Sequence, residues 1–197
     1  IYNQEYLNYP VDESIAIFRR ADMLPIVESA LENLLQNKIP LHHYVGVDLA
    51  VSKDNRADYS AFIIVGVDAS NMMYVLDVIK GRFDTKEIID TLFDIQTTYQ
   101  PLWFAIEKGM IEKAIGPFLY EEMFKRNTFL NLELITPSID KEEKARSISG
   151  RFRIKGIRFF KEAEWYPGLE SELTQFPRAR HDDQVDALSM IGLGLMK

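Results

Sequence analysis

Short apolar runs separated by polar links dominate the sequence between residues 44 and 135. The first three runs lie at 44–50, 59–67 and 73–79, and the second is rich in Ile and Val, which is typical of strands. The link Asp68–Asn71 has the composition of a turn. Together these runs predict an antiparallel meander of three strands.

Strands and helices alternate after the meander. Asp84 and Glu87 have the spacing of a capping box at the start of a helical pattern that runs to Phe93. The further predicted elements are a strand at 102–107, a helix at 111–126, a strand at 132–135 and a helix at 140–152. This order predicts an α/β fold with a mixed central sheet flanked by helices.

The two ends of the chain have a different organisation. Residues 1–40 predict two helical stretches, at 14–21 and 26–35, without any pattern that indicates chemistry. We interpret them as a linker or lid in front of one domain that spans residues 41–197. The first residues lack an initiator Met and a signal peptide, so we expect a piece of a longer polypeptide. A helix at 165–176 precedes the last apolar segment.

The composition restricts the chemistry. A chain of 197 residues that is 47% hydrophobic can form one substantial globular domain. It contains no Cys, which excludes disulfides, thiolate zinc sites and cysteine nucleophiles. Any metal would therefore be held by oxygen ligands, with at most some help from the three His. Since no apolar run is long enough to cross a bilayer, we expect no membrane association.

The charge is negative overall and positive in one segment. A net charge of −7 argues against a protein that coats nucleic acid by bulk electrostatics, but not against an enzyme that acts on it. Residues 141–158 are locally basic, and Gly156 predicts a tight turn or a hairpin there. Such side chains usually form a solvated helix face, but this is the stretch that could follow a phosphate backbone. The candidate DNA-binding residues are Lys144, Arg146, Arg151, Arg153, Lys155 and Arg158.

Three acids lie within five residues at the start of the last apolar helix: Asp182, Asp183 and Asp186. Acids are common there, because their oxygens cap free N–H groups and the helix dipole favours negative charge. Asp183 and Asp186 are also three residues apart, so they share one side of the helix and could bind a hard cation. Both interpretations stay open until partners are considered.

Two further acids stand at comparable positions. Asp48 lies in or at the end of the first strand, and Glu107 ends a later buried strand. Sites in α/β sheets gather at the carboxyl ends of strands, so these two side chains are expected to converge with those of Asp183 and Asp186. Four carboxylates so close together require neutralisation, for which Mg²⁺ or Mn²⁺ is suited. Two ions about 3.5–4 Å apart would support phosphodiester hydrolysis.

Three motifs carry a family resemblance: Gly-Val-Asp-Leu-Ala at 46–50, Trp-Phe-Ala-Ile-Glu at 103–107 and His-Asp-Asp-Gln-Val-Asp-Ala at 181–187. In this order they resemble the ribonuclease H-like nuclease domain of the large terminase subunit of tailed phages. Residues 4–10 resemble the end of the terminase ATPase domain. The resemblance implies an endonuclease that uses two metal ions to cut concatemeric double-stranded viral DNA when packaging begins and ends.

The resemblance also implies roles for individual residues. Asp48 would bridge two ions, Glu107 would hold one and Asp183 the other, with Asp186 as a ligand or close beside them. Three residues are expected near the ligands: Asp58, Asp182 as the helix cap, and His181 in positioning or proton transfer. The basic segment would be the DNA-contacting insertion of the family.

The implied partners are double-stranded DNA, the terminase ATPase domain in the same polypeptide, the portal protein and the small terminase subunit. The implied location is the cytoplasm of the host cell. A phosphate loop of the form Gly-x-x-x-x-Gly-Lys-Ser/Thr is absent from the sequence, so we expect no ATPase activity from this chain.

Three other classes of protein compete with this interpretation. A Holliday-junction resolvase or transposase core would share the acids, but the segment at 4–10 argues against it. A sugar-kinase-like or actin-like half would carry Gly-rich phosphate loops, where this chain has Lys53-Asp54-Asn55-Arg56. A non-catalytic packaging module would use the acids as helix caps, and it predicts no dependence on metal.

Overall fold

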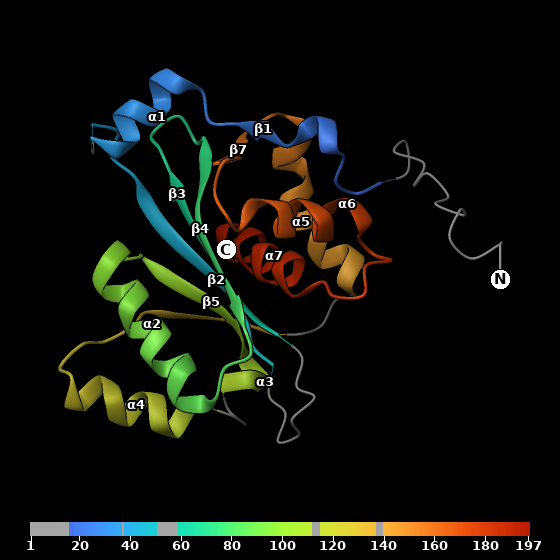
Figure 1. Cartoon of the computed structure of the whole chain (residues 1–197). Coiled ribbons are helices and arrows are strands. Elements are labelled where there is room, and N and C mark those ends of the chain that lie inside the picture. Colours follow the sequence, from blue (N-terminus) through green and yellow to red (C-terminus); the bar gives the residue numbers. More distant parts are fainter. Residues whose placement is uncertain (1–15, 37, 51–58, 112–114, 137–139) are drawn as a thin grey trace, which may run out of the picture.

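The computed structural model describes residues 16–36, 38–50, 59–111, 115–136 and 140–197. These residues form a mixed sheet in the order β1-β7-β4-β3-β2-β5-β6, with helices on both faces (Figure 1). The strands are β1 Leu24–Pro25, β2 His42–Asp48, β3 Ser60–Val67, β4 Met73–Gly81, β5 Trp103–Glu107, β6 Leu132–Ile135 and β7 Ile157–Phe159. The helices are η1 Arg20–Asp22, α1 Glu28–Leu35, α2 Thr85–Tyr99, α3 Lys108–Met110, α4 Gly116–Lys125, α5 Lys141–Arg153, α6 Tyr166–Gln175 and α7 Asp183–Leu195.

The predicted meander and the parallel strands that follow it are confirmed. β2 pairs antiparallel with β3 and β3 with β4, whereas β2–β5 and β5–β6 are parallel. The β2–β5 register pairs Val47 with Ile106. The residues that follow this pair, Asp48 and Glu107, therefore end neighbouring strands at the same edge of the sheet.

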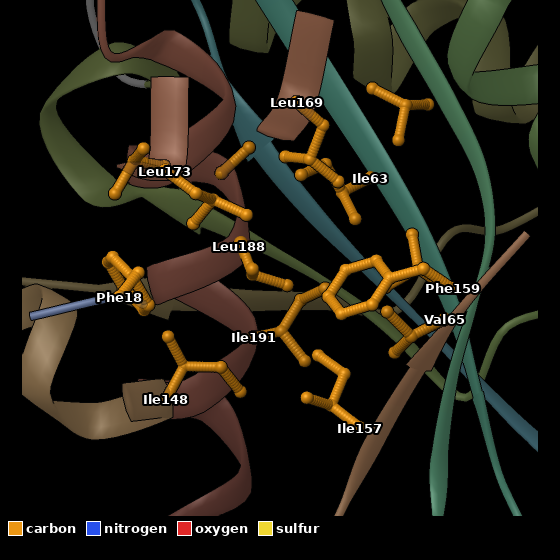
Figure 2. Packing of buried hydrophobic residues seen from close by; sticks show 14 of the residues in the cluster. Phe18, Ile63, Val65, Ile148, Ile157, Phe159, Leu169, Leu173, Leu188 and Ile191 are labelled. Atoms are coloured by element: carbon orange, nitrogen blue, oxygen red, sulfur yellow. The ribbon is translucent and has the colours of Figure 1, made fainter. Parts of the chain in front are cut away.

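Two layers of helices cover the sheet. Helices α5, α6 and α7 lie on one face, and α2 and α4 lie on the other (Figure 1). On the first face, Leu188 and Ile191 of α7 point toward sheet residues such as Ile63 and Val65 (Figure 2). Burying side chains of this size stabilises the fold by roughly 1.5–3 kcal/mol each, which holds α7 firmly on the sheet.

The contact between α7 and β2 is unusually close. A Cβ added to Gly46 would lie 1.9 Å from the carbonyl oxygen of Ala187. Real Cβ atoms do not approach backbone oxygens so closely, so this crossing requires glycine. Because Asp48 lies two residues after Gly46, the close crossing brings the first turn of α7 to the end of β2.

The N-terminal part of the described chain differs from its prediction. The helix predicted over 14–21 is wrong over residues 16–19, and only the short η1 follows. Phe18 and Met23 are buried in the core beside α7, and β1 pairs with β7. Burial of these two side chains and strand pairing outweigh the local helical spacing. The domain boundary between residues 40 and 41 stays a prediction.

Helix α4, Gly116–Lys125, confirms the described part of the helix predicted at 111–126, and the short α3 ends just before that range. Residues 112–114 lie outside the described residues. A chain turn does occur near Gly156, where Lys155 has a φ of 58°. The predicted hairpin is wrong, however, because the turn leads into β7, which lies parallel to β4 and β1. Ile157 and Phe159 are fully buried, so core packing forms a strand that is too short to recognise within a basic segment.

Helix α2 begins as predicted. The Asp84 carboxylate accepts a 2.8 Å hydrogen bond from the backbone N–H of Glu87, whose carboxylate accepts one of 2.8 Å from the backbone N–H of Asp84. This reciprocal capping box satisfies two N–H groups that the helix itself leaves free. Both acids are exposed.

The described helices include none with the length and apolar character needed to cross a membrane.

Candidate active site

The structure brings three of the four predicted metal-binding acids to one cavity. Asp48 reaches it from the end of β2, and Asp183 and Asp186 reach it from the first turn of α7. The cavity has a volume of about 460 Å³. Its other lining residues are Leu49, Ala50, Tyr59, Lys141, Arg180, His181 and Asp182. The predicted convergence of strand-end and helix-start acids is therefore present for these three side chains.

Glu107, the fourth acid, stands beside this group. It ends β5 and is partly exposed, and it is not among the residues that line the cavity. The ammonium nitrogen of Lys144 lies 4.0 Å from Glu107 Oε2. Lys144 of α5 thus reaches toward the end of β5.

The electrostatics of Asp48 reflect its crowded position. Burial, together with the negative charges of Asp186 and Asp183, raises the pKa of Asp48 to about 7. Lys144 and Lys141 act in the opposite direction but do not cancel these effects. The Asp48 carboxyl is therefore partly protonated at neutral pH when no other cation is present.

Asp183 is buried and is held by a lysine. Its Oδ2 lies 2.9 Å from Lys80 Nζ, and the same ammonium lies 2.5 Å from Glu172 Oε1. Burial lowers the pKa of Lys80, but the bonds and charges of these two carboxylates raise it above its ordinary value. Lys80 is thus a fixed cation that orients the Asp183 carboxylate.

Asp182 occupies the N-cap position of α7, but its side chain does not cap the helix. Both of its carboxylate oxygens instead accept hydrogen bonds of 2.8 Å from Lys141. The cap comes from α6, where Glu172 Oε2 accepts a 2.9 Å bond from the backbone N–H of Gln184. The prediction of Asp182 as the helix cap is wrong because packing of α6 beside α7 supplies a better-placed carboxylate.

Asp186 contains an unpartnered oxygen. Its Oδ2 lies 3.4 Å from Lys141 Nζ, while its buried Oδ1 has no hydrogen-bond partner among the described residues. Burial raises the pKa of Asp186, against the opposing charges of Lys141 and Lys144. A buried acceptor without a partner costs about 1–3 kcal/mol, so this position favours a bound cation.

The donor set suits a hard divalent ion, since it consists of carboxylate oxygens and includes the free oxygen of Asp186. As the side chains are placed, however, no three or more His, Asp or Glu within the described ranges are arranged to hold an ion. Ammonium groups of Lys80, Lys141 and Lys144 lie among the acids instead. The oxygen donors therefore suit a metal, while the lysines provide part of the neutralising charge.

The other predicted site residues have varied positions. His181 lines the cavity, and its ring meets Tyr59 edge to face, with 5.3 Å between the ring centroids. Asp58 lies outside the described residues. The roles of these residues stay predictions.

The predicted DNA-binding residues divide into three groups. Arg146, Arg153 and Lys155 are exposed. Arg151 donates to the backbone and side-chain oxygens of Asn71, and Arg158 donates to the carbonyl oxygens of Lys155 and Ile157. The side chain of Lys144 is only 13% exposed and turns toward the acids. Phosphate contact by any of them stays a prediction.

Sequence reasoning missed three residues of the site: Lys80, Glu172 and Tyr59. Lys80 follows Val78 on the core-facing side of β4, and a lysine at such a position was the available signal. Tyr59 lies between charged groups, with Lys80 and Arg82 at 4.8 and 4.9 Å from its ring centroid. Glu172 gave no local signal, because its partners lie far away in the chain.

No protein-family model matches the chain, and no curated protein matches it either. Among solved structures, it is similar to the large terminase nuclease of the thermophilic phage G20c with bound magnesium, at 13% identity and a TM-score of 0.57. That alignment covers 78% of this chain and 81% of the G20c chain. The same nuclease was also solved with bound zinc and with bound cobalt.

Two further solved structures are similar. The large terminase nuclease domain of Thermus phage P74-26 is 15% identical with a TM-score of 0.56, covering 76% of this chain and 77% of the other. The large terminase of bacteriophage HK97 is 13% identical with a TM-score of 0.62, covering 91% of this chain. The match spans only 43% of the HK97 chain. The chain thus has the ribonuclease H-like fold of phage large terminase nuclease domains.

Proposed function

We propose that this chain is the nuclease part of a phage large terminase, a metal-dependent endonuclease that cuts concatemeric double-stranded DNA at the start and end of packaging. The observation that carries this proposal is the meeting of Asp48, Asp183 and Asp186 in one solvent-open cavity. The acids occupy the strand end and helix start of a fold shared with terminase nucleases. A capping role for these acids has less support, since Glu172 caps α7.

The cofactor proposed is a pair of Mg²⁺ or Mn²⁺ ions held by Asp48, Asp183 and Asp186, with Glu107 as a further ligand. Support comes from the oxygen donor set and from the magnesium, zinc and cobalt bound to the G20c nuclease. When bound, such ions lower the pKa of a water and stabilise the oxygen that leaves the phosphodiester.

Neighbouring residues would fix the positions of the metal ligands. Lys80 and Glu172 fix the Asp183 carboxylate, and the Gly46 crossing fixes α7 relative to the end of β2. Ligands that start from rigid elements keep their spacing more precisely than ligands on loops. His181, which lines the cavity, would position a water or carry a proton at its ring nitrogen.

The partners proposed are double-stranded DNA, an ATPase domain in the same polypeptide, the portal protein and the small terminase subunit, in the host cytoplasm. The length of the HK97 terminase, of which the match covers 43%, is consistent with a further domain there. The exposed basic residues Arg146, Arg153 and Lys155 provide candidate phosphate contacts.

Plasmid cleavage with Mg²⁺ or Mn²⁺, and with chelator, tests the proposal. Asp48→Asn should reduce cleavage by at least about 100-fold, more than the loss typical of residues that only support ligands. Asp94→Asn, which changes an exposed acid of α2, should cleave normally. Cleavage in chelator, or full activity of Asp48→Asn, would contradict the proposal. Preference for a four-way junction over linear duplex would favour a resolvase instead.

A further inference from the structure

Lys141 contacts two of the acids at the start of α7. Its ammonium nitrogen lies 2.8 Å from each carboxylate oxygen of Asp182 and 3.4 Å from Asp186 Oδ2. One ammonium from α5 thus bridges two carboxylates of α7. The other oxygen of Asp186, a side chain that is 9% exposed, is a buried atom without a hydrogen-bond partner among the described residues.

Local helix energetics do not explain a lysine at this place. Lys141 is the first residue of α5, whose N-terminus is capped by Asp140 through the N–H groups of Glu142 and Glu143. A cation at a helix N-terminus opposes the helix dipole. The benefit must therefore come from the tertiary contact with the acids.

Lys144 repeats the arrangement one turn later. It lies on the same side of α5 as Lys141, three residues on, and its ammonium lies 4.0 Å from Glu107 Oε2. Two ammonium groups of α5 thus face the edge of the sheet where the carboxylates gather. The chain itself therefore supplies part of the positive charge that the acids of this edge require.

The lysines of the site differ in their freedom to move. The side chain of Lys80 is 20% exposed and is held between Asp183 and Glu172. The side chain of Lys141 is 56% exposed, so its stem reaches the acids from solvent. Lys141 can therefore leave the carboxylates toward solvent by rotating its own side chain more easily than Lys80 can.

We propose that Lys141 is a positioning residue that acts as an internal counter-cation, occupying Asp182 and Asp186 until a divalent ion displaces it. It holds α5 against α7 in the metal-free protein and sets the metal concentration at which the site fills. The proposal rests on the proposed function in taking these carboxylates as metal ligands. It adds a competitor for them that belongs to the chain.

Manganese binding, measured by calorimetry on the purified chain, tests this proposal. Removing an ammonium that must leave these carboxylates before the ion binds should tighten the Kd of Lys141→Gln about fivefold to tenfold. Lys141→Arg keeps the charge and should stay within about twofold of the wild type. Lys86→Gln, which loses an 84% exposed lysine on α2, controls for net charge and should also match the wild type.

Three results would overturn the proposal: an unchanged Kd in Lys141→Gln, a weaker one, or equal tightening in Lys86→Gln. Each of these leaves the proposed function intact, because the wild type still binds Mn²⁺. A wild type that binds no Mn²⁺ contradicts the proposed function itself. These two failures are therefore distinguishable.

A second measurement uses the wild-type protein and does not depend on how the variants fold. Acylation of lysines, followed by mass spectrometry, reports how free each ammonium group is. Addition of Mn²⁺ should raise the reactivity of Lys141 and leave that of Lys86 unchanged. Constant reactivity of Lys141 at saturating Mn²⁺ would show that the ion does not displace it.

Discussion

Helices α2 and α7 both begin with acids, but the two starts use them differently. At α2, Asp84 and Glu87 bind each other's backbone N–H groups and remain exposed. At α7, Asp182 turns to Lys141, and Glu172 of α6 takes over the capping. An acid whose oxygens bind its own helix is structural. At α7 the cap comes from Glu172, so the acids of the helix start are available for chemistry.

The second arrangement is costly for stability. Asp48 and Asp186 have raised pKa values because burial disfavours their charged forms, and Asp186 retains a buried oxygen without a partner. The acids of α2 face solvent and carry no such cost. Functional sites commonly reduce stability in this way, since they keep groups that the fold alone would neutralise.

The largest effect on stability is expected from removing the Glu172 carboxylate, which caps α7. Glu172→Ala removes the acceptor of the Gln184 backbone N–H and one of the two carboxylate partners of Lys80. Loss of one partner from a mostly buried charged network should lower the free energy of unfolding by about 3 kcal/mol. Urea denaturation measures it, with Ser171→Ala as the exposed control on α6. A change no greater than that of the control would show that α7 does not depend on this cap.

A smaller effect on stability is expected from removing the titrating carboxyl of Asp48. The pKa of Asp48 is near 3.8 in the unfolded chain and about 7 in the folded protein. Between these two pH values the folded protein binds a proton that the unfolded chain has lost. The free energy of unfolding in chelator therefore falls as pH rises through this window. Asp48→Asn should match the wild type near pH 4 and exceed it by about 2 kcal/mol at pH 8, where solvent at the open cavity moderates the effect.

Thermal unfolding of both proteins in chelator, at a series of pH values, gives the difference directly. A constant offset between the two across the series would mean that Asp48 does not titrate near 7. A lower stability of Asp48→Asn at pH 8 would also contradict the expected sign.

The smallest effect is expected at the start of α2. Asp84→Ala removes the oxygen that accepts from the N–H of Glu87, and loss of such a cap costs about 1 kcal/mol. Plasmid cleavage should remain at the wild-type level, because α2 lies on the face of the sheet away from the acids. A parallel loss of cleavage would contradict the division between structural and functional helix starts.

Much of the fold was predictable because its signals are local. The meander strands, β5 and α7 each bury a long enough apolar run to be recognised alone, and Asp84 and Glu87 specify their cap within four residues. The positions of Asp48 and Glu107 at strand ends followed from the same runs. Their shared edge followed from the expected parallel pairing.

The remaining features depend on partners distant in the sequence. β1 and β7 are two and three residues long and exist because they pair with each other and with β4. Glu172 caps a helix that starts eleven residues later, and Lys80 reaches Asp183 from another strand. Lys141 was included in the basic segment, but its two carboxylate partners could not be identified without the packing of α5 on α7.

The glycine at position 46 has a consequence for how this site tolerates change. Its missing side chain lets the backbone of β2 touch the carbonyl of Ala187, one residue beyond Asp186. The distance between the acid of the strand and those of the helix is therefore set by this backbone contact, which lies two residues from Asp48. A single methyl group there would spread the acids apart while leaving every one of them in the sequence, so a complete set of acids alone does not guarantee a working site.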